Sequence, residues 1–335
     1  MRYLLLLSLF LPLNCFCQVK DYTSYHKGIN KAEEVFFMRE NADSALYYYD
    51  KVFADYDFIF VKDLVNAAQI AIFSGKPYVR YIEKGFEHGL KLSHLKNYPL
   101  FAKAYPALLK DKKLQSAYTE NRKTYVASID FKYLDWIYKT AIKDQKDKLK
   151  KNYSTLVRQT TDELMDSVIK KGFPGDRIIG IADSTIFKEI NKPWLDLYEQ
   201  RKNDKSLFYM TSGEQILSQQ YPQVMLVHNS CSYHLYKNIL LSEMKKGNIH
   251  PRDIALIYDN MYRFKGSFAT YCDNVALKGA YGLNLFTDFS KLANITEAND
   301  MRKKLYIVSV EVDEIKRDYE EKYGFRLFSG FWGCR

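Results

Sequence analysis

The chain lacks any residue pattern that is diagnostic of one catalytic chemistry, and several other features are scarce. After its first residues it has no apolar run near the 20 residues needed to span a bilayer, so we expect no transmembrane helix. It has no long run of basic residues despite a net charge of +10, which argues against nucleic acid as a partner. Cysteine is rare, with five in 335 residues.

The opening stretch MRYLLLLSLFLPLNCFCQ has the pattern of a signal peptide. Arg2 precedes a short apolar run, and Cys15 and Cys17 suit the small positions before a cleavage site. We therefore predict that residues 1–17 are removed, that no transmembrane helix remains, and that the protein is exported to the periplasm or outside the cell. Cleavage before one of these two cysteines, which would give a lipoprotein, is the alternative.

Charge and cysteine content limit the partners and the covalent cross-links of the exported chain. Loss of Arg2 leaves a net charge of +9, which favours anionic surfaces such as a cell-envelope polymer. The plainer interpretation is that Lys-rich helices keep the protein in solution. Three cysteines remain, Cys231, Cys272 and Cys334, and an oxidising compartment permits one disulfide and one thiol. The sequence leaves the pairing open.

Residues 18–125 contain a loose internal repeat. Residues 25–56 and 58–89 share a layout of helix, short polar break and helix, at an offset of about 33 residues. The breaks fall at Glu40-Asn41 and Ser74-Gly75. This resembles tetratricopeptide repeats, and residues 91–125 could supply a third pair. Plain helical hairpins are the alternative. Stacked repeats build concave surfaces for a protein or peptide partner.

Residues 126–335 read as a mainly helical domain with a small β or irregular segment near the C-terminus. Helices are predicted at about 130–153, 160–171, 223–246 and 251–265, and a strand at 305–313 paired with 325–331. Gly247 suits a left-handed helix end, and Pro251 suits the first position of the next helix. The short link between these two helices predicts an antiparallel hairpin.

The stretch VMLVHNSCSYHLY places His228, Cys231 and His234 three residues apart. On one continuous helix the two histidines would lie about 120° apart, so they cannot share a metal ion. Cys231 lies on an apolar stripe, where cysteine is more often an inert filler or half of a disulfide than a nucleophile. No metal and no cofactor are expected.

His228 is the residue of this stretch that demands a partner. It lies on the most apolar face of the predicted helix, and a buried polar group without a partner costs about 1–3 kcal/mol. The hairpin offers Asp259, Arg263 and Asp253. An aspartate that holds the imidazole would fix its tautomer. This arrangement fits either a catalytic base or a satisfied core network.

A set of short motifs runs through the same region. They are Asp144-Gln145 with Lys148, Gly172-Phe173-Pro174-Gly175, His228, Asp259 and Tyr281-Gly282. From about Lys143 onward this pattern resembles a bacterial family catalogued as a domain of unknown function. Its members show Asp-Gln, Gly-Trp-Pro-Gly, Gln-His-Ala, Asp-Arg and Tyr-Gly in this order.

This chain departs from the family pattern at several positions. Val227 replaces Gln, Asn260 replaces Arg after Asp259, and Arg263 follows one turn later; about residues 183–215 form an insertion. The resemblance implies that the matched Asp144, Gln145, His228 and Asp259 converge on one pocket. It implies no activity.

Three functions are compatible with these features, and whether the protein is an enzyme stays open. The first is an exported protein- or peptide-binding module with a polar pocket in its C-terminal domain. The second is a cell-envelope polymer hydrolase, with His228 as base, Asp259 as its orienter and Asp144 as a second acid or clamp. The third is small-molecule binding between the hairpin and the Asp144-Gln145 helix, with Lys148 and Arg263 as further binding residues.

Overall fold

The computed structural model describes residues 20–183, 185–192, 217–263, 279–283 and 294–327. Over these ranges the chain forms helices and no strand, which confirms a mainly α fold. The first helices are α1 (Thr23–Arg39), α2 (Ala42–Asp55), α3 (Val61–Phe73), α4 (Val79–Glu87), the 3-10 segments η1 (Leu92–Asn97) and η2 (Pro99–Phe101), α5 (Tyr105–Leu108) and α6 (Lys112–Ser128). The others are α7 (Phe131–Asp147), α8 (Tyr153–Lys171), α9 (Asp176–Ile179), α10 (Ile186–Glu189), α12 (Tyr221–His228), α13 (Ser232–Lys245), α14 (Pro251–Arg263), α15 (Ile295–Lys304) and α16 (Val310–Tyr323).

Two packed helical pairs open the chain, and their breaks lie where the sequence predicts them. Glu40 adopts a left-handed conformation, and the Asn41 side chain then caps α2 by accepting a hydrogen bond from the Ser44 amide at 2.9 Å. The second break is formed by Ser74 and by Gly75, whose φ is +66°. Both are ordinary helix stop and start signals.

The third predicted pair is only half regular. Residues 91–108 form the short turns η1, η2 and α5 in place of a first helix, and only α6 is long. The α6 helix starts at Asp111, whose carboxylate accepts from the Leu114 amide at 3.0 Å, and it packs on α4. The likeness to tetratricopeptide repeats stays a prediction.

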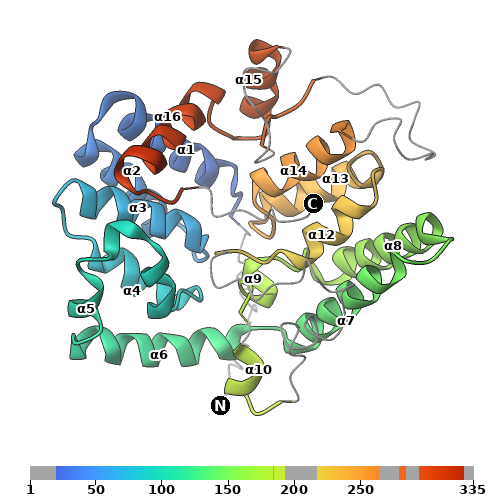
Figure 1. Cartoon of the computed structure of the whole chain (residues 1–335), viewed down its shortest axis with the longest axis horizontal. Coiled ribbons are helices and arrows are strands. Elements are labelled where there is room, and N and C mark those ends of the chain that lie inside the picture. The colour runs from blue at the N-terminus through green and yellow to red at the C-terminus, as the bar shows by residue number, and fades with distance from the viewer. Residues whose placement is uncertain (1–19, 184, 193–216, 264–278, 284–293, 328–335) are drawn as a thin grey trace, which may run out of the picture.

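The described residues bury two main apolar cores. One lies among α1–α6 and α16, and the other lies mainly among α7, α8, α12, α13 and α14. Figure 1 shows the two groups of helices side by side, with α9 between them. The boundary predicted at residue 125 falls inside α6, and Tyr125 belongs to the second core.

The helix predicted at 130–153 is shorter in the structure, and the helix predicted at 160–171 is longer toward its N-terminus. The α7 helix ends at Asp147, and α8 begins at Tyr153 after a short turn. α8 then ends at Gly172, whose φ of +87° continues into the predicted Gly-Phe-Pro-Gly turn. The two helices pack against each other, which places the end of α7 beside the start of α8.

The hairpin of α13 and α14 is confirmed. Gly247 has a φ of +76°, and the amide of Asn248 bonds the carbonyl of Glu243 at 3.0 Å. Pro251 then starts α14. Glycine tolerates this backbone conformation because it has no Cβ.

The strand predicted at 305–313 is wrong. Residues 310–313 form the first turn of α16, and the described part of 325–331 holds no strand. Tertiary packing overrides the local β propensity of these residues, because that propensity depends strongly on context. Val312 joins the first core, and Asp313 reaches a buried charge cluster.

That cluster ties the C-terminal helices to both halves of the molecule. The Asp313 carboxylate accepts two hydrogen bonds from Arg252 of α14, at 2.7 and 3.0 Å, and one from Arg302 of α15 at 2.9 Å. Lys316 of α16 pairs with Glu33 of α1 at 2.8 Å. Burial alone would raise the pKa of Asp313, but the two guanidiniums outweigh it and hold that pKa well below its usual range.

Among the described helices, none has the length and apolarity to cross a membrane. The predicted signal peptide at residues 1–17 lies outside the described residues.

Replacing Asp313 by Leu should lower the free energy of unfolding by about 3–5 kcal/mol, because it leaves buried cations without their counter-charge. Urea denaturation measures this difference. The adjacent Glu314 is exposed, so Glu314→Leu is the matched control and should change stability by less than about 0.5 kcal/mol. Equal effects of the two substitutions would contradict the assignment.

A second prediction concerns acid stability. Burial, together with the smaller effect of nearby Lys84, lowers the pKa of His88 to about 4. The unfolded state therefore takes up a proton near its ordinary pKa of 6.5 while the folded state does not, so stability is full above that pH and falls toward pH 4.

His88→Phe keeps an aromatic ring against Phe58 and removes this titration. Between about pH 7.5 and pH 5 the variant should lose about 2 kcal/mol less stability than the wild type. Denaturant titrations at the two pH values give the difference. An identical loss in both proteins would refute a buried, uncharged His88.

Candidate functional site

His228 is the last residue of α12. The helix predicted at 223–246 is interrupted directly after it and resumes as α13. Asn229 leaves the helical conformation with φ −91° and ψ 101°. Its side chain accepts from the Cys231 amide at 3.0 Å and donates to the Thr161 hydroxyl at 2.7 Å. The bond to Cys231 is local and competes with the helix, while the bond to Thr161 of α8 fixes the Asn229 side chain at the break. The single-helix geometry assumed for this stretch is therefore wrong.

The break leaves His228 facing a buried carboxylate from α7. Nδ1 of His228 lies 2.5 Å from Oδ2 of Asp144, and Tyr153 donates from its hydroxyl to Oδ1 at 3.2 Å. The Asp144 side chain is fully buried, whereas that of His228 keeps 10% of its surface exposed. A carboxylate at Asp144 accepts a hydrogen bond from the Nδ1–H group of the uncharged ring, which leaves the Nε2 lone pair as an acceptor.

Gln145 is buried beside Asp144 on the same helix and is unsatisfied. Among the described residues neither its Nε2 nor its Oε1 has a hydrogen-bond partner, although the residue is only 1% exposed. A buried amide in this state costs free energy unless a ligand or a water molecule completes it. Lys148, also predicted for this site, caps the C-terminus of α7 and is half-buried.

Asp259 does not contact His228. Its two oxygens accept from the backbone amides of Tyr281 and Leu283, at 2.7 and 2.8 Å. Burial raises the pKa of Asp259 to about 6, against the opposing effect of these two hydrogen bonds. The predicted orienter of His228 is therefore replaced by Asp144, and Asp259 instead holds the Tyr281-Gly282 motif to α14.

Asn260, the residue after Asp259, connects α14 to the end of α12 at His228. Its Nδ2 donates to the Val227 carbonyl at 2.7 Å, one residue before His228. The matched residues thus form two connected clusters, Asp144 with His228 and Asp259 with Tyr281. Sequence reasoning treated Asn260 only as a departure from Arg, and it missed Tyr153. Arg263 ends α14, and its side chain lies outside the described residues.

The structure also bears on the two other interpretations of this stretch, a Cys-His nucleophile and a metal site. Cys231 is disulfide-bonded and fully buried, so it is not a free nucleophile, and its partner cysteine lies outside the described residues. His234 is exposed on α13. In the part of the chain that the structure describes, no three His, Cys, Asp or Glu side chains lie close enough to hold a metal ion.

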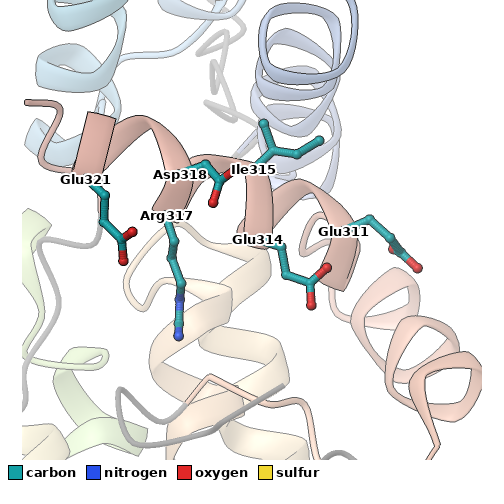
Figure 2. Close-up of a pocket in the computed structure, with 6 residues that line it drawn as sticks. All are labelled: Glu311, Glu314, Ile315, Arg317, Asp318 and Glu321. Carbon is teal, nitrogen blue, oxygen red and sulfur yellow. The ribbon is translucent and has the colours of Figure 1, made fainter. Parts of the chain in front are cut away.

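A shallow acidic depression lies on the surface of α16. Figure 2 shows its side chains projecting from this one helix, and they are Glu311, Glu314, Ile315, Arg317, Asp318 and Glu321. Asp318 is paired with Lys322 at 2.8 Å, and Glu311 accepts from Asn299. Solvated charges of this kind are typical of an outer helix face and identify no ligand.

In comparisons with known proteins, no family model, no curated protein and no solved structure matches the chain significantly. The resemblance to the family of unknown function stays a prediction, and the site rests on its geometry.

The Asp144–His228 contact predicts the tautomer of the uncharged ring. Nitrogen NMR of the histidine ring at alkaline pH should show the proton on Nδ1 of His228. Asp144→Leu should abolish this preference, whereas His234 should be unaffected in both proteins. An Nε2–H tautomer of His228 in the wild type would contradict the assigned hydrogen bond.

Proposed function

We propose that this is an exported helical protein that binds a polar ligand at the Asp144–His228 pair. The observation that supports it is the contact of the partly exposed imidazole with a fully buried carboxylate. The pair fixes the ring and offers Nε2 as an acceptor to a hydroxyl or amide donor. The unsatisfied Gln145 amide on the same helix could supply further hydrogen bonds.

Export is part of the proposal. The predicted signal peptide supports it, and so does the disulfide at Cys231, because disulfides persist in oxidising compartments. The net positive charge suits an anionic envelope polymer as partner. A peptide-binding role for α1–α6 rests on their resemblance to repeats alone.

Hydrolysis of an envelope polymer is the second candidate, and the same contact favours it. An imidazole held at Nδ1 by a buried carboxylate can take a proton from water through Nε2, which is the geometry of a general base. His228 would be the base and Asp144 its orienter. Asp259, which binds backbone amides, would support the nearby loop.

The binding proposal is tested by saturation-transfer NMR with a panel of uronic acids, amino sugars and short peptides. At least one should bind the wild type and bind His228→Ala about tenfold or more weakly. His234→Ala is the matched control because that ring is exposed on the adjacent helix. A panel without binders, or binding that survives His228→Ala, would overturn the proposal.

The hydrolase candidate is tested with purified peptidoglycan, by measuring the release of soluble fragments. A general base contributes about 10²–10⁴-fold, so His228→Ala should abolish most of any release while His234→Ala retains it. Release that is equal in all three proteins, or absent from the wild type, would remove peptidoglycan hydrolysis from consideration.

A further inference from the structure

A second polar cluster lies where the two halves of the molecule meet, away from Asp144. It comprises Lys62 in the first turn of α3, Asp176 at the start of α9, Gln223 in α12 and Asp253 in α14, and we call it the junction cluster. Figure 1 shows α9 between the two groups of helices that contribute these residues. Nothing in the proposed function uses it.

Contacts between the elements fix the C-terminal side of the junction cluster. The Gln223 amide donates to Oδ2 of Asp253 at 3.4 Å, which joins α12 to α14. Oδ1 of Asp176 accepts from the backbone amide of Gln219 at 2.5 Å, which joins α9 to the segment before α12. Each of the two carboxylates has a second oxygen that accepts no hydrogen bond from the described residues.

Edge-to-face ring contacts connect the junction cluster to the N-terminal half of the molecule. His250, three residues before Asp253, lies 5.4 Å from His26 of α1 and 5.0 Å from Phe60, measured between ring centres. The Lys62 ammonium lies 5.8 Å from the centre of the Phe60 ring. Lys62 therefore lies beside the contact of Phe60 with His250, the residue that directly precedes α14.

The electrostatics agree with this geometry. The pKa of Asp176 is raised to about 7, chiefly by burial and to a smaller extent by Asp253, while Lys62 is the strongest opposing influence. Burial, with a smaller contribution from Lys62, lowers the pKa of His26 to about 3. The field of one ammonium therefore reaches groups from both halves of the molecule.

The polar groups of the junction cluster are only partly satisfied by the described residues. Among the described residues, no carboxylate lies within ion-pair distance of Lys62, in contrast to the fully paired Asp313. Oε1 of Gln223 and Nε2 of His26 are buried, and no described residue gives either of them a hydrogen bond. Gln223 and His26 are 3% and 2% exposed, whereas Lys62 and Asp253 each keep part of their surface exposed.

We propose that the junction cluster binds a small zwitterion, a molecule with an ammonium group beside a carboxylate, such as a free amino acid or a short peptide. The ligand's carboxylate binds the Lys62 ammonium. Its ammonium donates to the free oxygens of Asp176 and Asp253 and to Oε1 of Gln223. Such a ligand satisfies both signs of charge at once, which neither an amine nor a carboxylic acid alone can do.

The test uses glycine, L-alanine, D-alanine and L-alanyl-L-alanine as probes, with ethylamine and propionate as half-ligands. At least one zwitterion should raise the melting temperature of the protein and give saturation-transfer NMR signals at millimolar concentration. The half-ligands should bind about tenfold or more weakly. Equal binding of a half-ligand, or no zwitterion binding at all, overturns the proposal and leaves water as the occupant.

Variants locate the binding. Lys62→Met and Asp253→Asn should each weaken it about tenfold or more, while Lys113→Met, at an exposed lysine of α6, should not change it. Circular dichroism establishes that each variant is folded, and Gln223→Leu provides a third, uncharged change with the same expected direction. His228→Ala should leave zwitterion binding intact. Binding lost in His228→Ala but kept in Lys62→Met would overturn this site.

Discussion

The buried carboxylate of Asp313 is the constraint on which the arrangement of the C-terminal helices depends. It accepts hydrogen bonds from Arg252 and Arg302, which lie on two different helices. Lys316, on the same helix as Asp313, pairs with Glu33 in the first half of the molecule. Removing charges from water is costly, so such a cluster persists only when each charge is paired. This requirement draws the C-terminal helix onto the N-terminal half, where an apolar pattern alone would allow other placements.

From that cluster a line of satisfied polar contacts leads to the candidate site. Arg302 also binds the backbone carbonyl of Tyr281, whose amide binds Asp259. The next residue, Asn260, holds the end of α12, where His228 meets its buried carboxylate. Scaffold residues and site residues differ in whether their hydrogen-bonding groups are already filled by the protein. Asp259 has its acceptors filled by backbone amides, whereas the imidazole keeps an exposed edge.

Much of the fold could be predicted from local sequence, and the contacts of the site could not. Gly247 and Pro251 mark the hairpin because their backbone preferences act within a few residues. The break at Asn229 depends on a bond to Thr161, 68 residues away in sequence, so a continuous helix is the natural reading. Asp144 was recognised as a site residue only through the family resemblance. Its pairing with His228 spans 84 residues, and no periodicity encodes it.

The central claim is that His228 is held by Asp144 and not by Asp259. A double-mutant cycle on the free energy of unfolding measures this directly, with Asp144→Asn and Asp259→Asn each combined with His228→Ala. The account predicts a coupling of about 1.5–3 kcal/mol between Asp144 and His228, as for a charge-assisted hydrogen bond, and no more than about 0.5 kcal/mol between Asp259 and His228. Negligible coupling for the first pair, or a larger coupling for the second, would contradict it.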